Sequence, residues 1–409
     1  MTCAVSDLET SPQARRQRRL VAIAQLTSLS CWFSATAVAP ALRADLGIGA
    51  AGAVLLTSSV QIGFVVGAVA SAASNLADRF DPTRVAAAGA ALAALCTVAL
   101  TVLADGLAVA VLLRLLTGAA LACVYPVNMK IMASWSPARI RGRAFGVLIG
   151  ALTLGSAVPQ LIRGIEDLPW QGVMLGAAIL TLVGAGIAAT LVHPGPERPG
   201  GPVHLNPRYA VAMFAQRGPR LANLGYFGHM WELYALWTWL PTFLLASQTA
   251  ADGPTAGAVN LTAFAAIGVA GAAGCLLGGL AADRLGRAPA AVWALAVSGI
   301  CCVASPLFYG RPLALVLPFL LVWGAAVIAD SGVFSTALSE TADPRFVGTA
   351  LTAQTAIGFL LTVATIHLVP LLADAVGWQW AFWPLALGPL AGATAMARFG
   401  TAPRPRPAA

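Results

Sequence analysis

Charged residues are scarce in this sequence. Asp, Glu, Lys and Arg make up 10% of its 409 residues, whereas 58% are hydrophobic, and the mean hydropathy is +0.80. A soluble domain carries about 25% charged residues, so this composition excludes one. The apolar runs also lack the alternation over about ten residues that is typical of membrane β-strands. These two absences predict an all-α integral membrane protein that crosses the bilayer many times.

Catalytic and nucleotide-binding motifs are absent as well. The sequence contains no GxxxxGK[ST] loop, no HExxH and no GxSxG, the motifs typical of ATPases, metalloproteases and serine hydrolases. We therefore expect no enzyme activity and no cofactor, so that any transport work comes from an ion or solute gradient. The seven cysteines form no CxxC pair, and most lie in apolar runs. This favours packing residues over disulfides or metal ligands.

Twelve apolar stretches are long enough to be membrane-spanning helices, which need about 20 residues. They are residues 20–42, 52–77, 84–104, 107–133, 142–163, 170–192, 221–247, 256–282, 288–309, 312–338, 346–372 and 378–398. The predicted parts of the chain are an N-terminal tail (1–19), a six-helix bundle (20–192), a Pro/Gly-rich linker (193–220), a second six-helix bundle (221–398) and a C-terminal tail (399–409).

The basic residues lie almost entirely on one side of this topology. Twenty of the 24 Lys and Arg residues fall in the tails, the linker and the loops on the same side, three fall in the opposite loops, and Arg114 lies within the fourth span. Positively charged loops stay in the cytoplasm, so we expect a multi-pass protein of the cytoplasmic (inner) cell membrane with both termini cytoplasmic. This distribution accounts for the net charge of +8 without a basic groove, so we expect no nucleic-acid partner.

The two predicted bundles carry an internal repeat. Four short matches recur at offsets of 205 to 208 residues: Asp78-Arg79 with Asp283-Arg284, Thr117-Gly118-Ala119-Ala120 with Trp323-Gly324-Ala325-Ala326, Arg141-Gly142 with Val347-Gly348, and Trp170-Gln171 with Trp378-Gln379. Parallel repeats of six spans are a transporter architecture whose binding site lies between the halves, near the middle of the bilayer.

The second copy of the repeat resembles the signature loop of the major facilitator superfamily. It reads Gly279-x-x-x-Asp283-Arg284-x-Gly286-Arg287. In the first copy Ser74 replaces the leading glycine, and Asp81-Pro82 replaces the Gly-Arg pair, while Asp78-Arg79 remains. The resemblance covers essentially the whole chain. It implies a secondary carrier that alternates between inward-open and outward-open states about a site between its two halves.

The polar residues of these two loops are candidates for a conformational latch. A carboxylate can contact a helix N-terminus, or an arginine of a neighbouring span, in one state only, and glycine lets two helix ends approach. The alternative is that these residues only fix topology and hairpin geometry. The resemblance favours a latch that comprises Asp78, Arg79, Gly279, Asp283, Arg284, Gly286 and Arg287.

The seventh span carries two ionisable residues inside an apolar run. His229 and Glu232 share one helical face with Gly225 and Leu236. A charged side chain in the centre of a bilayer costs roughly 2.5–3.5 kcal/mol on insertion scales, so it is expected to face a polar cavity or a partner. One interpretation is substrate or proton binding, and the other is a structural hydrogen bond to a neighbouring helix.

Two more charges lie within predicted spans. Arg114 begins a pattern, Arg-x-x-Thr-Gly, that resembles the fourth-span motif of proton-linked family members. It could bind a carboxylate or an anionic substrate, or it could be a snorkelling or structurally paired residue. Asp330 aligns with Val124 in the repeat, so the fold of both halves does not require this acid. It could bind protons or substrate, or pair structurally with Lys130 or Arg345.

Polar and aromatic side chains complete the predicted cavity. The resemblance implies that spans 1, 4, 7 and 10 line it. Aromatic residues near Glu232 could stack against a flat or cationic solute, whereas those near the outer end could lie at the membrane interface. The remaining candidates for the lining are Trp32, Gln61, Asn128, Tyr226, Trp231 and Gln354.

The fifth span is rich in glycine. Gly146, Gly150 and Gly155 precede Pro159 in a pattern that partly resembles a motif of drug/proton antiporters. Glycine is also common wherever membrane helices make close contact. We favour the packing interpretation, so the motif does not establish export.

These observations predict a secondary active transporter of a small organic solute, coupled to protons and working as a monomer in the lipid bilayer. One alternative is a facilitator or exchanger of organic anions that is anchored by Arg114. A second alternative is a non-transporting membrane receptor built on the same fold. The sequence does not identify the substrate or the direction of transport, because fold does not determine substrate.

Overall fold

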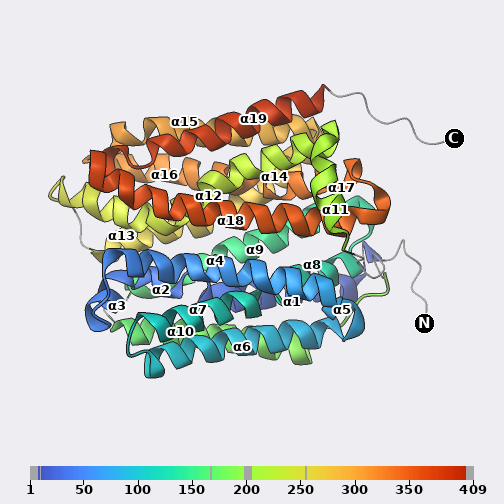
Figure 1. The fold of residues 1–409 in the computed structure, drawn as a ribbon, viewed down its shortest axis with the longest axis horizontal. Coiled ribbons are helices and arrows are strands. Elements are labelled where there is room, and N and C mark those ends of the chain that lie inside the picture. The colour runs from blue at the N-terminus through green and yellow to red at the C-terminus, as the bar shows by residue number, and fades with distance from the viewer. Residues whose placement is uncertain (1–7, 10, 166–167, 198–204, 254–255, 402–409) are drawn as a thin grey trace.

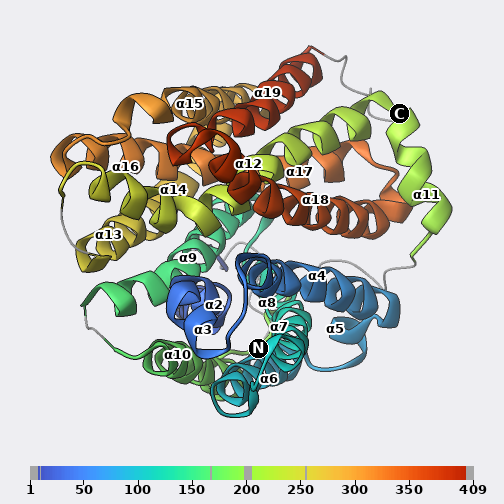
Figure 2. The ribbon, with the colours of Figure 1, turned by 60° about the vertical axis from the view of Figure 1, so that its left-hand side comes forward.

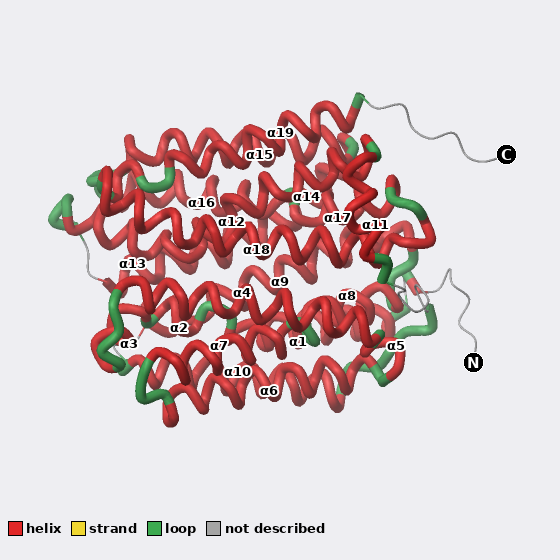
Figure 3. Tube along the Cα trace, viewed as in Figure 1, coloured by secondary structure: helices red, strands yellow, loops and turns green. Residues whose placement is uncertain are grey.

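The computed structural model describes residues 8–9, 11–165, 168–197, 205–253 and 256–401. In this part of the chain the secondary structure is helical, without a strand, and short loops join the helices at the two ends of an elongated bundle (Figure 3). Nine of the helices in the described residues are long and apolar enough to cross a membrane. The prediction of an all-α membrane fold is therefore confirmed.

The helices form two groups in chain order. The first half comprises α1 (Pro12–Ser28), η2 (Leu29–Cys31), α2 (Ser34–Ala37), α3 (Ala39–Asp45), α4 (Ala50–Ser74), α5 (Leu76–Arg79), α6 (Pro82–Leu103), α7 (Leu107–Leu121), α8 (Tyr125–Ser134), α9 (Ala138–Ile165) and α10 (Trp170–Thr190). Two short elements, α11 (Pro207–Ala212) and η3 (Met213–Ala215), follow in the predicted linker. The second half comprises α12 (Arg217–Thr249), α13 (Ala256–Ala263), η4 (Phe264–Ala270), α14 (Gly271–Leu285), α15 (Arg287–Phe308), α16 (Leu313–Ala329), α17 (Ser331–Thr341), η5 (Pro344–Phe346), α18 (Val347–Val376), η6 (Trp378–Trp380), η7 (Trp383–Ala386) and α19 (Leu387–Gly400).

The two halves lie side by side with their long helices roughly aligned (Figures 1 and 2). They meet along two seams, because α9 packs against α13, η4 and α14 while α4 packs against α18. We call the end of the bundle that carries α5 and α11 the linker end, and the end that carries α3 and α13 the opposite end (Figure 1).

Several predicted spans are interrupted, and the twelfth begins as the two short elements η6 and η7 before α19. The first begins at Pro12 rather than at residue 20, since proline is tolerated in the first turn of a helix, and it breaks between α1 and α2 at residues 29–33. The fourth breaks between α7 and α8, where Pro126 lies in the first turn of α8 and cannot donate a helical hydrogen bond. The tenth breaks at Asp330, which aligns with Val124 at the break of the fourth.

Close backbone contacts explain the repeated glycines. A Cβ atom at Gly118 would collide with the carbonyl oxygen of Val60, and one at Gly324 would collide with the carbonyl oxygen of Ala266. Both contacts join the equivalent pairs of helices in the two halves, α7 with α4 and α16 with η4. The matching Thr-Gly and Trp-Gly segments are thus sites of close helix packing.

The glycines of the fifth span also approach other helices closely. A Cβ atom at Gly146 would lie 3.3 Å from the carbonyl oxygen of Cys275, and one at Gly150 would lie 3.3 Å from that of Ala272. Both neighbours belong to α14 of the other half. These glycines let α9 and α14 approach along one of the two seams, which supports the packing interpretation.

Candidate functional site

Six aromatic rings fill the middle of the interface between the halves, and we call them the central aromatic cluster. Ring centroids are 4.6 Å apart for Phe64 and Phe359, 5.0 Å for Trp32 and Phe64, and 5.1 Å for Tyr234 and Phe359. All six side chains are buried. The first half contributes Trp32, Phe33 and Phe64, and the second contributes Tyr234, Trp237 and Phe359.

Polar groups without partners lie beside this cluster. The indole Nε1 of Trp32 donates to Gln61 Oε1 over 3.1 Å. Because an indole N–H can only donate, this bond fixes the orientation of the amide and turns Gln61 Nε2 away from Trp32. Within the described residues Gln61 Nε2 and Trp237 Nε1 have no hydrogen-bond partner, although both side chains are buried. Gln354, on α18, is also buried without a partner for either amide atom in the described residues.

Arg114 lies on α7 and holds the break in the first span. Its guanidinium donates to the carbonyl oxygens of Cys31 at 3.2 Å and Trp32 at 2.6 Å, and to Ser34 Oγ at 3.3 Å. The side chain is fully buried, and no carboxylate pairs with it in the part of the chain that is described. Arginine suits this position because its planar fork reaches several oxygens at once.

The other predicted lining residues contact helices of their own half. Asn128 donates to Gln25 Oε1 over 2.7 Å. Tyr226 packs against Gly358 of α18, and Trp231 packs against Gly388 of α19. The aromatic side chains of the seventh span therefore fall into two groups. Tyr226 and Trp231 pack within the second half, whereas Tyr234 and Trp237 belong to the central aromatic cluster.

Glu232 is held inside the second half by three donors. Ser298 Oγ lies 2.6 and 2.8 Å from its two carboxylate oxygens, and Cys302 Sγ and Trp323 Nε1 lie 3.1 and 2.6 Å from Oε1. These donors come from α15 and α16. The carboxyl group thus connects three helices, and the geometry matches the structural hydrogen-bond interpretation.

His229 lies on the same helix but contacts the break in the tenth span. Its Nδ1 lies 2.9 Å from Asp330 Oδ1, and its Nε2 lies 3.0 Å from Ser331 Oγ. The His–Asp contact has the distance of an ion pair without the alignment of a hydrogen bond, and Asp330 Oδ2 has no partner in the described residues. Both side chains are at most 2% exposed. The pair joins α12 to the junction of α16 and α17.

The partners that the sequence suggested for Asp330 were wrong. Lys130 pairs with Asp78, and Arg345 pairs with Asp343 at 2.7 Å. Both basic residues lie at the linker end, and each pairs with a carboxylate of its own half.

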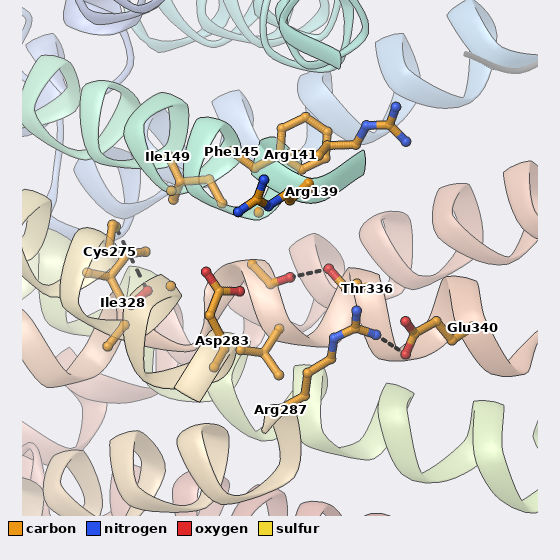
Figure 4. A pocket seen from close by; sticks show the side chains of 17 residues that line it. Arg139, Arg141, Phe145, Ile149, Cys275, Asp283, Arg287, Ile328, Thr336 and Glu340 are labelled. Atoms are coloured by element: carbon orange, nitrogen blue, oxygen red, sulfur yellow. Dashed lines mark hydrogen bonds and ion pairs between the residues drawn. The ribbon is translucent and has the colours of Figure 1, made fainter. Parts of the chain in front are cut away.

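A cavity of about 380 Å³ lies between the halves toward the linker end (Figure 4). Arg139, Arg141 and Gly146 of α9 form one wall. Asp283 and Glu340 belong to the facing wall, which α14, α15, α16 and α17 provide. Ala329, Gly332 and Val333 also line the cavity, so it reaches the break at which the His–Asp pair lies.

The candidate latch residues make contacts mainly within their own half. Arg287 pairs with Glu340 across α15 and α17 (Figure 4), as Asp78 does with Lys130 in the first half. Asp283 instead faces the other half, because its Oδ1 lies 3.7 Å from the position of a Cβ atom at Gly142. Arg79 and Arg284 are exposed and form no ion pair among the described residues.

The two copies of the signature loop start the next helix differently. In the first copy Asp81 is the N-cap of α6, where its carboxylate accepts from the Thr83 amide at 2.8 Å and hydroxyl at 2.7 Å, and Pro82 follows in the first turn. The Thr83 hydroxyl, supported by the backbone amides, lowers the pKa of Asp81. In the second copy Gly286 precedes α15 with a φ of +89°, a conformation that favours glycine.

Sequence reasoning missed several residues of this region. It did not find the aromatic partners Phe33, Phe64 and Phe359, because nothing local distinguishes them from packing residues. It also missed Trp323 as a donor to Glu232, although a signal existed. Trp323 aligns with Thr117 in the repeat, and this difference between the halves accompanies a carboxylate that the first half lacks.

Comparison with known proteins agrees with this architecture. No curated protein matches the chain. A family model described as the Major Facilitator Superfamily matches residues 21–365, a range that includes most of both halves, the central aromatic cluster and the signature loops. The chain therefore belongs to the major facilitator superfamily.

Proposed function

We propose that this protein is a proton-coupled carrier of a small organic solute, with the His229–Asp330 pair as its protonation site. Membership of the family makes the chain a secondary transporter with a small-molecule substrate and a membrane environment. The proposal adds the coupling ion and its site. It also places the protein in the inner membrane with both termini cytoplasmic, because basic residues dominate the loops of the linker end.

The observation that carries the proposal is a buried acid with a free oxygen at a helix break. Asp330 is 1% exposed on its side chain, its Oδ1 lies 2.9 Å from His229 Nδ1, and its Oδ2 has no partner in the described residues. An ionisable group inside a membrane is costly and marks a functional site by default. Its neighbours Ala329 and Gly332 line the cavity, so the proposed proton route runs from the linker end.

Proton binding at this pair can bias the conformation of the carrier. The pair connects α12 with the junction of α16 and α17, and its attraction depends on whether the aspartate is charged. A change in protonation therefore changes the contact between these helices, and a ligand shifts a conformational equilibrium by its differential affinity for the two states. Glu232 has a different role in this proposal, since three donors already hold it.

A pH step applied to reconstituted protein tests this assignment without knowledge of the substrate. Proteoliposomes adsorbed on a solid-supported membrane report the charge that moves when protons bind. We expect a transient displacement that is at least about ten-fold smaller in Asp330→Asn, because an asparagine amide, unlike a carboxylate, does not take up a proton over the pH range of the step.

Glu232→Gln is the matched control for this experiment. It also neutralises a buried acid of the second half, and its amide can still accept from Trp323 and donate to Ser298, so the displacement should persist. An unchanged signal in Asp330→Asn, or an equal loss in Glu232→Gln, would refute the assignment. Empty liposomes give the background.

A further inference from the structure

We infer that the transported solute is a small planar organic anion, such as an aromatic carboxylate, and that the central aromatic cluster binds it. This inference rests on the proposed function, because it assigns a substrate class to the same carrier. It draws on the shape of the cluster, the kind of polar group left without a partner, and the placement of buried charge.

The shape of the cluster favours a flat solute. Its rings come from both halves, and pairs across the interface lie at centroid distances of 4.6 to 6.0 Å. Such distances suit offset or tilted ring contacts. When the halves move, rings that now contact one another separate. A planar solute can then make the same kind of contact with each ring. It would thereby contact both halves of the carrier at once.

The unpaired polar groups at the cluster are mainly donors. Gln61 Nε2 is a donor by necessity, because its Oε1 already accepts from Trp32. Trp237 Nε1 is also a donor and is unpaired among the described residues. A buried polar group without a partner costs about 1–3 kcal/mol. A solute that brings acceptor oxygens to these two N–H groups would remove that cost, whereas an ammonium group, which only donates, would not.

The buried charges beside the cluster favour an anion over a cation. Arg114 is fully buried, and its partners are neutral oxygens, one of which is the carbonyl of Trp32 at 2.6 Å. Its positive charge therefore lies next to the cluster without a carboxylate in the described residues. The negative groups are placed differently, since Glu232 has three donors and Asp330 has His229. Arg114 acts here through the field of its charge, while its hydrogen bonds stay on the first span.

Three probes of the same shape test the inference. Benzoate, benzamide and benzylamine carry an anionic acceptor, a neutral amide and a cationic donor on one ring. We expect calorimetric titration of the purified protein in nanodiscs to give benzoate a dissociation constant at least about ten-fold lower than that of benzylamine, with benzamide between them. A tenfold ratio corresponds to about 1.4 kcal/mol, which is close to the lower end of the contribution of one hydrogen bond to a charged group.

Two substitutions locate the binding site. Gln61→Glu keeps an oxygen for the Trp32 indole but replaces the free donor with an acceptor, so it should weaken benzoate at least about ten-fold and remove the preference over benzylamine. Trp237→Phe keeps a ring and removes the unpaired N–H, so it should weaken benzoate by a smaller factor. Trp239→Phe is the matched control, because its indole already donates to the Ile366 carbonyl at 2.9 Å and lies outside the cluster.

The results separate this inference from the proton-coupling proposal. Equal binding of the three probes, tighter binding of benzylamine through ring faces that attract cations, or no binding of any probe would overturn the inference. None of these outcomes changes the charge displacement expected of Asp330. Conversely, if the charge displacement does not depend on Asp330, the proton-coupling proposal fails, but the binding preference for benzoate can still be measured.

Discussion

Gly278→Ala destabilises the protein severely, whereas Gly279→Ala keeps or slightly raises its thermal stability, because alanine favours a helix more than glycine does. A Cβ atom at Gly278 would collide with the carbonyl oxygen, the carbonyl carbon and the Cα atom of Ala329. These are backbone atoms, so α14 and α16 would have to separate. Overpacking in a dense interior costs about 1–3 kcal/mol and occasionally more, and we expect the upper end here. Unfolding followed by intrinsic tryptophan fluorescence in detergent measures the loss.

The adjacent glycine supplies the control for this substitution. A Cβ atom at Gly279 would meet nothing within 4 Å, and the residue lines the cavity between the halves. The two variants therefore change the same atoms at neighbouring positions of one helix. Equal melting temperatures would show that α14 and α16 are not as close as described.

Arg114→Met lowers stability more than Arg114→Lys, and both lower it relative to the parent protein. Methionine leaves the carbonyls of Cys31 and Trp32 and the hydroxyl of Ser34 without their donor, at about 1–3 kcal/mol for each buried group. Lysine restores a charge but lacks the fork that reaches three oxygens. The measurement is again thermal unfolding of the purified variants.

The opposite result would return Arg114 to the role of a substrate anchor. Removal of an unpaired buried charge that served only the ligand would leave the free protein equally or more stable. It would then abolish solute binding alone. Arg311→Met is the control, because Arg311 is an exposed residue at the opposite end of the bundle and its side chain supports no break in a span.

The spans and the internal repeat could be predicted because both appear in the chain as local or periodic patterns. The apolar stretches predicted the spans because a helix must keep about 20 apolar residues in the bilayer, whatever it packs against. The repeat was visible because equivalent glycines, such as Gly118 and Gly324, meet equivalent carbonyls in the two halves. The breaks within spans were harder to predict from the sequence. Pro126 marks one of them, but Asp330 lies at another without a proline nearby.

The contacts of the buried charges could not be predicted in the same way. His229 and Glu232 are three residues apart on one helical face, yet they contact different helices. Their partners depend on the rotation of α12 and on its distances to α15, α16 and α17. The partner of Asp330 could not be predicted for the same reason. Lys130 and Arg345, the basic residues that the sequence suggested for it, pair with other acids.

By itself, the sequence determined that this chain is a helical membrane protein made of two related halves, with a few ionisable residues inside its spans. Hydropathy and internal repetition are properties of the linear sequence, so both can be recognised without knowledge of how the helices pack. Only the tertiary structure decided which of those residues are already satisfied. In it, Arg114 donates to a broken span and Glu232 accepts from three donors, whereas Asp330 and Gln61 keep atoms that have no partner among the described residues. The reason is that a hydrogen bond requires atoms about 3 Å apart, and such proximity between distant segments is set by helix packing.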